Sequence, residues 1–438
     1  MRQEKEITII GGGLAGSEAT WQLAKRGVAV TLLEMRPEVK TPAHQTGLMG
    51  ELVCSNSLGA DDFSSAAGIL KAELRCLDSL IMEAADHSVV PAGKALAVDR
   101  KEFASYITEK ISSHPLVRIE RKEVIAIPDG MSIIATGPLT SPTLARKIQQ
   151  LSGQENLSFF DAVAPVVFHD SIDMDRAYRA GRYGQRADYI NCPMNKEEYV
   201  TFVEALTTAE RAPRHDFEKD VHYFEGCLPV EVIASRGIDT LRFGPLRPVG
   251  LPDPSSGCEP YAVVQLRQDN AEGSLYNLVG FQTSLKWGEQ DRVFRLIPAL
   301  ERAEFARYGV MHRNIYVNAP KVLDRYLRFQ KHETLFLAGQ ITGVEGYLES
   351  TAMGLVAGLN MASLVKGKDL PSWPAETGIG SLLRYLQETD PEVFHPMNVN
   401  LGIFPPLGEK IRKRAERCKK VGLRSMKALD FFLKSLPQ

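Results

Sequence analysis

Two cysteines stand in segments whose small and polar residues would keep a thiol accessible. Cys54 lies in "GLMGELVCSNSLGADD", and Cys227 lies in "HYFEGCLPVEV", between a glycine and a Leu-Pro pair. A thiolate in such a place can act as a nucleophile or accept a proton. Free cysteine is also among the residue types most often buried, where it packs as a small apolar side chain. The local context therefore leaves both a catalytic and a structural role open for each thiol.

The other cysteines give weaker signals. Cys76 falls within the helical pattern "AAGILKAELRCLDSLIM" and is expected in the core, whereas Cys192, Cys258 and Cys418 give no further indication. The six cysteines are widely scattered, without a CxxC pair and without a Cys/His cluster of zinc-site spacing. This distribution predicts reduced thiols, no bound metal and a cytoplasmic protein.

The elements that would position these groups begin with a nucleotide-binding pattern. Strand "EITII", turn "GGGLAG", helix "SEATWQLAKRG" and strand "VAVTLLE" follow one another as half of a βαβ unit. Gly11 permits the tight turn, Gly13 lets the backbone approach a pyrophosphate, and Gly16 lets the helix pack on the strand. The phosphates would lie at the helix N-terminus. The candidate binding residues of this turn are Gly11, Gly12, Gly13, Leu14, Ala15 and Gly16.

An acidic residue completes this pattern. Glu34 ends the second strand, eighteen residues after Gly16, where its carboxylate can accept hydrogen bonds from both ribose hydroxyls. A carboxylate there would exclude a ribose 2′-phosphate. The glycine pattern predicts a dinucleotide but does not by itself distinguish NAD from FAD.

Two later segments favour FAD. The segment "SIIATGP", at residues 132–138, is typical of a buried strand that returns to the dinucleotide. The segment "TLFLAGQITGVEGYLESTAMGL" contains another apolar strand, a glycine-bearing loop and a helix of small residues. Such a loop suits ribityl and phosphate groups, and its candidate residues are Gly339, Gln340 and Gly346. Flavoproteins of this type usually place Asp where Gln340 stands, so the ribityl contact departs from the usual pattern.

The length of the chain requires more than one core. Single cores stop growing near about 250–300 residues, and this chain has 438. "NKEEYVTFVEALTTAERA" predicts a helix capped by Asn195, and later segments predict short strands joined by Gly, Pro and Asp-Asn turns. "KWGEQDRVFRLIPALERAEFARYG" is interpreted as a helix that returns the chain to the main body.

These patterns predict an α/β fold: a Rossmann-like FAD-binding domain with an inserted α+β domain that contains an antiparallel sheet. We expect the first part of the FAD-binding domain at residues 1–185. The inserted domain, for substrate or tRNA, is expected at residues 186–315, and the second FAD-binding part at residues 316–438.

The charge distribution is uneven. The net charge of −2, with 44% hydrophobic and 24% charged residues, predicts no general attraction to nucleic acid or membrane. Neither a signal-peptide pattern nor an apolar run of the roughly 20 residues needed to span a bilayer is visible.

From Gly408 onward, however, the chain contains ten Lys and Arg and only three Asp and Glu. Helical spacing of the apolar residues there leaves an outward basic face, which is either simply solvated or binds a polyanion such as RNA. The expected members of this face are Arg412, Lys413, Arg417, Lys419, Lys420 and Arg424.

Several longer motifs resemble one family. They are "IIGGGLAGSEA", "GELVCSNSLGAD", "DYINCPMNKEEY", "HYFEGCLPVEVIASRG", "PYAVVQLRQDNA", "YNLVGFQTSLKWGEQ" and "GQITGVEGYLESTAMGL". Together, from residue 7 to about residue 406, they resemble the bacterial folate- and FAD-dependent tRNA uracil-5 methyltransferases, TrmFO, which are related to the GidA/MnmG flavoproteins. In this family the motif itself contains Gly-Gln, which fits Gln340.

The resemblance implies a methylenetetrahydrofolate-tRNA-(uracil-5-)-methyltransferase. Such an enzyme takes one carbon from 5,10-methylenetetrahydrofolate, uses reduced FAD as reductant and methylene carrier, and makes 5-methyluridine in the tRNA T-loop. NADH or NADPH would supply the electrons. By the same resemblance, Cys227 adds to C6 of uracil and Cys54 removes the C5 proton. A thiolate suits the first role because C5 of uracil is a poor nucleophile until a group adds at C6.

Further contacts and alternatives follow from this reading. Arg267, Lys286 and Trp287 in the second domain could contact the folate tail or the T-loop, although exposed basic residues are commonly only solvated. The basic C-terminal helix or the second domain would bind the T-arm of tRNA.

The alternatives are a GidA/MnmG-like modification of anticodon wobble uridine, and a non-catalytic protein that binds flavin or RNA. The sequence carries no signal that indicates the oligomeric state.

Overall fold

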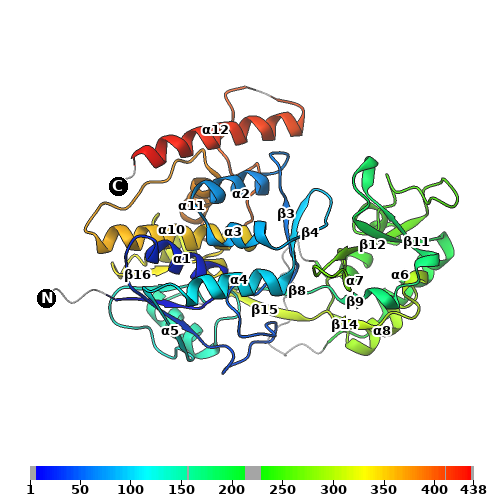
Figure 1. Cartoon of the computed structure of the whole chain (residues 1–438), viewed down its shortest axis with the longest axis horizontal. Coiled ribbons are helices and arrows are strands. Elements are labelled where there is room, and N and C mark those ends of the chain that lie inside the picture. The colour runs from blue at the N-terminus through cyan, green and yellow to red at the C-terminus, as the bar shows by residue number, and fades with distance from the viewer. Residues whose placement is uncertain (1–5, 155–156, 213–227, 410, 436–438) are drawn as a thin grey trace.

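A helix-rich unit and a smaller unit from the middle of the chain lie side by side in the computed structural model (Figure 1). The structure describes residues 6–154, 157–212, 228–409 and 411–435. The larger unit contains a parallel sheet and the smaller unit an antiparallel one. This arrangement confirms the predicted fold class.

The parallel sheet is the centre of the larger unit. Its order is β16-β7-β1-β2-β6, and every neighbouring pair is parallel. Four of its strands are short, largely buried runs, as parallel sheets require, whereas the edge strand β6 is charged and partly exposed. The strands are β1 (Ile7–Ile10), β2 (Val30–Glu34), β6 (Val117–Arg121), β7 (Ser132–Ile134) and β16 (Leu335–Leu337). Four of them correspond to the predicted dinucleotide strands.

Two helices cross closely beside this sheet. They are α1 (Leu14–Ala24) and α10 (Tyr347–Val365). A Cβ on Gly354 would stand 2.3 Å from the carbonyl oxygen of Ala15, so only glycine permits this approach. By length and composition α10 could cross a membrane, but 83% of its most apolar window is buried inside the protein. The apolar residues of α10 are therefore explained by its burial in the core of the larger unit.

The remaining helices of the larger unit surround this centre, with α12 on the outside next to α2 and α11 (Figure 1). They are α2 (Ala66–Cys76), α3 (Leu80–His87), α4 (Arg100–Ser112), α5 (Pro142–Ser152), α9 (Ala319–Val322), α11 (Gly378–Glu388) and α12 (Arg414–Ser435). A small sheet, β3-β5-β4, adds β3 (Ser57–Ala60), β4 (Val89–Val90) and β5 (Ala95–Val98).

Two expectations about these helices are wrong. Cys76 is exposed at the C-terminal end of α2. Arg424 is half-buried and donates to the carbonyl oxygens of Pro405 and Pro406, so it does not belong to the outward basic face.

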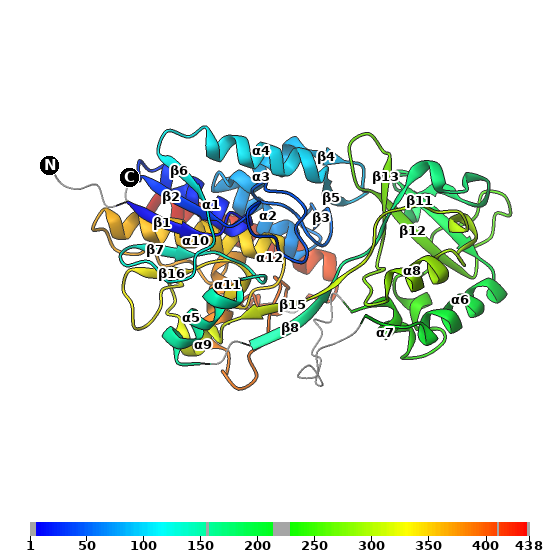
Figure 2. The same ribbon diagram turned by 90° about the horizontal axis from the view of Figure 1, so that it is seen from below.

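Two antiparallel strands connect the units. They are β8 (Leu157–Ala162) and β15 (Met311–Tyr316), and Figure 2 shows them running from one unit towards the other. The N–H of Val163 donates to the carbonyl oxygen of Val310 at 2.8 Å, so the pairing continues into the crossing. The orientation of the second unit is thus fixed by a two-stranded connection.

The second sheet is antiparallel throughout, in the order β10-β11-β12-β13-β9-β14. Its strands are β9 (Val166–Phe168), β10 (Tyr178–Ala180), β11 (Tyr189–Met194), β12 (Ala262–Gln268), β13 (Leu275–Leu278) and β14 (Phe305–Arg307). The expected domain boundary at residue 186 falls inside this sheet, since β9 and β10 precede it. We propose that the inserted unit begins at the crossing near residue 163 instead.

Three helices cover this sheet, namely α6 (Lys196–Thr208), α7 (Val230–Ala234) and α8 (Trp287–Phe294). The predicted cap of α6 is confirmed: Asn195 and Glu198 form a reciprocal capping box. The helix predicted through residue 309 ends at Phe294. Pro298 then lies in a short 3-10 helix, and the next residues form the edge strand β14.

Candidate functional site

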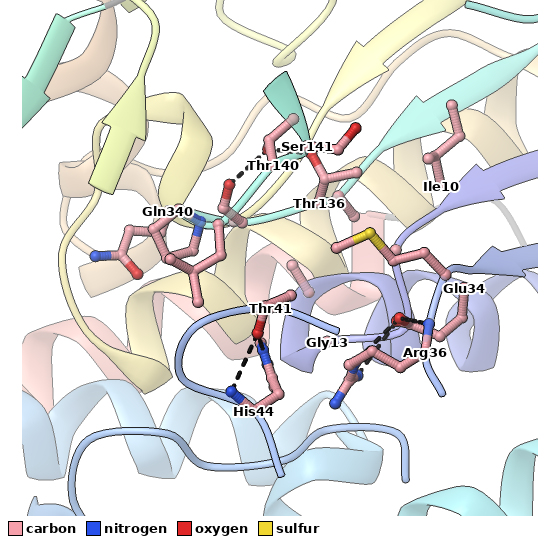
Figure 3. A pocket seen from close by; sticks show the side chains of 18 of the residues that line it. Ile10, Gly13, Glu34, Arg36, Thr41, His44, Thr136, Thr140, Ser141 and Gln340 are labelled. Carbon is pink, nitrogen blue, oxygen red and sulfur yellow. Dashed lines mark hydrogen bonds and ion pairs between the residues drawn. The ribbon is translucent and has the colours of Figure 1, made fainter. Parts of the chain in front are cut away.

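A pocket opens where the strands of the parallel sheet end (Figure 3). Its walls come from the glycine turn after β1, the end of β2, the loop after β7 and the turn after β16. Ligands of open α/β sheets bind at this edge, outside the carboxyl ends of the strands. Among the predicted residues, those that line the pocket are Gly11, Gly13, Leu14, Ala15, Glu34, Gly339 and Gln340.

The glycines of the turn have separate roles. Gly11 has a φ of +99°, and a Cβ there would stand 2.7 Å from the carbonyl oxygen of Ala135. A Cβ on Gly16 would stand 1.8 Å from the carbonyl oxygen of Gly11, so glycine is required for the helix to begin here. Gly13 has open space on its Cβ side and faces the pocket. It caps α1 without a side-chain hydrogen bond, which leaves first-turn N–H groups for an anionic ligand.

Glu34 is tied to the same turn. Its Oε2 accepts a hydrogen bond from the N–H of Gly12 at 2.7 Å, and its Oε1 accepts one from Nε of Arg36 at 3.0 Å. Arg36 also pairs with Glu51 at 3.1 Å. Burial by itself would raise the pKa of Glu34, but the hydrogen bonds and charge of Arg36 outweigh it and lower the pKa. The carboxylate is therefore held ionised in the pocket wall.

The turn after β16 forms the opposite wall. Gly339 has a φ of +82°, and a Cβ there would stand 2.7 Å from Cβ of Ala15. Nε2 of Gln340 donates to Oε2 of Glu345 at 2.5 Å. Gly346 instead begins α10, where a Cβ would stand 2.2 Å from Oε2 of Glu349. The start of α10 therefore explains why residue 346 is a glycine.

His44 is a pocket residue that sequence reasoning missed. Its Nδ1 lies 2.6 Å from Oγ1 of Thr41 (Figure 3). Burial, and then the positive charge of Arg36, lower the pKa of His44 to about 4. The imidazole is therefore neutral at pH 7. Its segment "TPAHQ" carries no motif that would have marked it.

The Cys54 loop joins the pocket to the second unit. The phenol oxygen of Tyr347, which lines the pocket, accepts hydrogen bonds from the N–H groups of Cys54 at 2.8 Å and Ser55 at 3.0 Å. The Cys54 thiol is half-buried and lies 3.6 Å from the carbonyl oxygen of Ala162. Burial, and then the Cys54 thiol, raise the pKa of Tyr347. Tyr347 therefore contacts both the pocket and the backbone of the Cys54 loop.

Two arginines hold this loop in place. Nη1 of Arg100 donates to the carbonyl oxygen of Leu52 at 2.7 Å, while its Nε pairs with Asp269 of the second unit at 2.9 Å. Arg267 is buried and donates to Oδ1 of Asn56 at 2.9 Å and to Oγ of Ser55 at 2.8 Å. Both units thus contribute to the conformation of the Cys54 loop.

The other predicted site residues lie elsewhere. Lys286 is exposed and pairs with Glu210 at 2.5 Å, and Trp287 is exposed with its ring stacked on Tyr308 at 5.6 Å. Arg267 is the one of the three that the structure brings to the Cys54 loop. Cys227 lies outside the described residues. Within the described part of the chain, no group of three or more His, Cys, Asp and Glu side chains is arranged to hold a metal ion.

Comparison with known proteins identifies the family. The family described as "Glucose inhibited division protein A" matches residues 6–369. A protein of Listeria welshimeri named methylenetetrahydrofolate–tRNA-(uracil-5-)-methyltransferase TrmFO is 58% identical over 427 residues, covering 97% of this chain and 98% of its own. The chain belongs to the TrmFO family. A TrmFO of Desulforudis audaxviator is 60% identical, with 94% of each chain covered.

The fold agrees with this family. The crystal structure of Aquifex aeolicus GidA superposes with a TM-score of 0.69 at 17% identity, over 99% of this chain and 74% of that one. At this identity the likeness shows a shared fold.

Proposed function

We propose that this protein methylates C5 of a uridine in the T-loop of tRNA. Membership of the TrmFO family supports a tRNA uracil-5 methyltransferase that uses methylenetetrahydrofolate and FAD. The observation that carries the proposal is the contact of Tyr347 with both the dinucleotide pocket and the Cys54 loop. This contact supports a role for the Cys54 loop next to the flavin that the pocket would hold. NADH or NADPH is the proposed electron source, and the proposed location is the cytoplasm.

The pocket residues fit FAD. The free N–H groups at the start of α1 would receive the pyrophosphate, and the open side of Gly13 leaves room for it. The carboxylate of Glu34 would accept hydrogen bonds from the adenosine ribose hydroxyls. These bonds would replace or accompany the hydrogen bond that Glu34 accepts from Arg36. Gly339 and Gln340 would line the ribityl side. FAD held in this way would supply the reducing equivalents for the transfer of one carbon from folate to uracil.

The two cysteines have complementary proposed roles. Cys227 would add to C6 of uracil, and Cys54 would take the proton from C5. The loop of Cys54 is fixed by Tyr347 and Arg100, which suits a base that must meet one defined atom. The target base must leave its stack in the T-loop, at a cost of a few kcal/mol.

The experiment that tests these roles uses T-arm RNA containing 5-fluorouridine. Wild-type protein should form a covalent adduct with it, and Cys227→Ala should not. Cys258→Ala is a matched control because Cys258 is exposed in the second unit. An adduct and full methylation by Cys227→Ala would show that this nucleophile assignment is wrong.

A further inference from the structure

One face of the antiparallel sheet meets the Cys54 loop and carries a row of paired residues. Arg267 pairs with Asn277, Asn277 with Val166, and Val166 with Arg307. Residues directly opposite each other in an antiparallel sheet project from the same face. Because Arg267 reaches the Cys54 loop from this face, Arg307 at the sheet edge is on the side of that loop.

Arg307 differs from Arg267 in its hydrogen bonds. Its Nε and Nη2 are buried and have no hydrogen-bond partner among the residues that the structure describes. A register shift between Phe305 and Arg307 also interrupts the strand here, and such bulges re-aim side chains next to active sites. A buried donor without a hydrogen-bond partner destabilises the folded protein, and a charged donor does so more strongly than a neutral one. The unpaired edge of this guanidinium therefore indicates a missing acceptor.

Arg307 belongs to the part of the second unit that adjoins the Cys54 thiol through β8 and β9. The carbonyl oxygen of Ala162 contacts the Cys54 thiol, and Val166, the partner of Arg307, lies at most about 13 Å further along the extended chain. Burial, and then the charge of Arg100, lower the pKa of Arg307 to about 10, while the Cys54 thiol acts in the opposite direction. The guanidinium stays cationic at neutral pH, and it interacts electrostatically with that thiol.

We infer that Arg307 binds O4 of the target uracil, an assignment that rests on the proposed function. When a thiolate adds at C6, a carbon–sulfur bond forms and the C5–C6 π pair moves towards C4. The carbonyl π pair then moves onto O4, so the negative charge passes from sulfur to oxygen and no proton is exchanged. A guanidinium whose Nε and Nη2 have no other acceptor stabilises this enolate, as preorganised donors stabilise other oxyanions.

The geometry favours the uracil oxygen over a folate carboxylate. C4 is bonded to C5, so a cation on the sheet face that meets the loop of Cys54, the proposed C5 base, suits O4 as its acceptor. A charged folate tail is better accommodated at a solvated rim, since burying a second full charge is costly. Nε and Nη2 of Arg307 are buried.

The test compares Arg307→Gln and Arg307→Lys in the FAD-loaded full-length protein. The rate of adduct formation with 5-fluorouridine T-arm RNA should fall about 10²–10³-fold in Arg307→Gln, as for the loss of an oxyanion donor. Arg307→Lys should retain part of the rate, and added guanidinium ions should restore part of it to Arg307→Ala. FAD content and RNA affinity should stay near wild type. Arg302→Gln is the control, because Arg302 is exposed in the segment just before β14.

Other outcomes overturn the inference. An unchanged adduct rate with a raised KM for methylenetetrahydrofolate would assign Arg307 to the folate. Loss of FAD or of the folded state in both Arg307→Gln and Arg307→Lys would assign it a structural role. The wild-type arm tests the proposed function separately, since absence of adduct and of methylation there contradicts the function itself.

Discussion

At the level of single residues, the pocket depends on charged groups that are buried and tightly paired. Glu34 is the clearest case, because donors from Gly12 and Arg36 occupy its carboxylate oxygens. We expect Glu34→Gln to lower FAD retention by about tenfold or more, since an amide cannot accept on both sides and leaves Arg36 without its partner. Flavin absorbance per protein after gel filtration measures this. Glu38→Gln, at an exposed position, should retain FAD.

His44 gives a pH dependence with a defined sign. Its pKa is lowered to about 4 in the folded protein, against about 6.5 when exposed. The unfolded state therefore binds a proton first as pH falls, so stability is fully present above pH 6.5 and is lost between about pH 6.5 and 4. The loss is up to about 3 kcal/mol. Urea unfolding across this range should show a smaller acid loss in His44→Gln, whereas His332→Gln, at an exposed position, should behave as wild type.

Some functional residues could not be found from the sequence. Gly11, Gly13 and Glu34 could be predicted because their spacing along the chain carries the signal. Tyr347, His44 and Arg307 could not, because their roles depend on burial and on contacts between distant segments. Sequence patterns thus predict the residues of the nucleotide turn, Glu34 and the glycine loop after the last parallel strand, all of which lie in short recognisable segments.

At the level of elements, a buried carboxylate joins three helices. Glu73 of α2 accepts hydrogen bonds from the N–H groups of Gly378 at 2.6 Å and Ile379 at 3.0 Å, at the start of α11. It also accepts one from the hydroxyl of Ser425 in α12. The same residue therefore anchors the basic C-terminal helix.

Removal of this anchor should destabilise the larger unit. Glu73→Ala leaves two buried N–H groups without an acceptor, so the free energy of unfolding should fall by about 2–4 kcal/mol. Urea unfolding of the FAD-bound protein measures the change. Glu102→Ala on the exposed side of α4 is the comparison, and an equal loss in both variants would contradict the anchoring role.

The elements also show which parts of the fold local patterns can predict. The N-terminal strand, turn and helix, and the Asn195 cap, follow from short-range spacing. The strands β9 and β14 are short and pair with partners more than a hundred residues away in sequence, so no local signal placed them in the second sheet. Likewise, Pro298 interrupts an otherwise helical apolar pattern and leads into β14.

At the level of the whole molecule, basic charge is concentrated on α12 although the chain carries a net charge of −2. Arg417 and Lys419 of α12 are exposed, as are Arg412 and Lys413 just before the helix, whereas Lys420 pairs with Glu409 at 2.7 Å. This face is the proposed contact for the phosphates of tRNA.

Charge reversal tests that contact. Arg417→Glu with Lys419→Glu should weaken tRNA binding and reduce its salt dependence, because each phosphate contact contributes to the slope of log K against log salt. Filter binding at several salt concentrations measures both effects. Arg146→Glu with Lys147→Glu, on α5, reverses the same number of charges at exposed positions outside α12. Equal losses in both variants would mean that α12 is not a specific RNA surface.

The transfer of carbon from folate to tRNA tests the account most directly. Protein loaded with FAD is given isotope-labelled methylenetetrahydrofolate, NADPH and unmodified tRNA, and the labelled nucleotide is then mapped. We predict label in 5-methyluridine of the T-loop, lost in Cys227→Ala. Label at the anticodon wobble uridine, or a T-loop methyl group that arises only from S-adenosylmethionine, would contradict the proposed function.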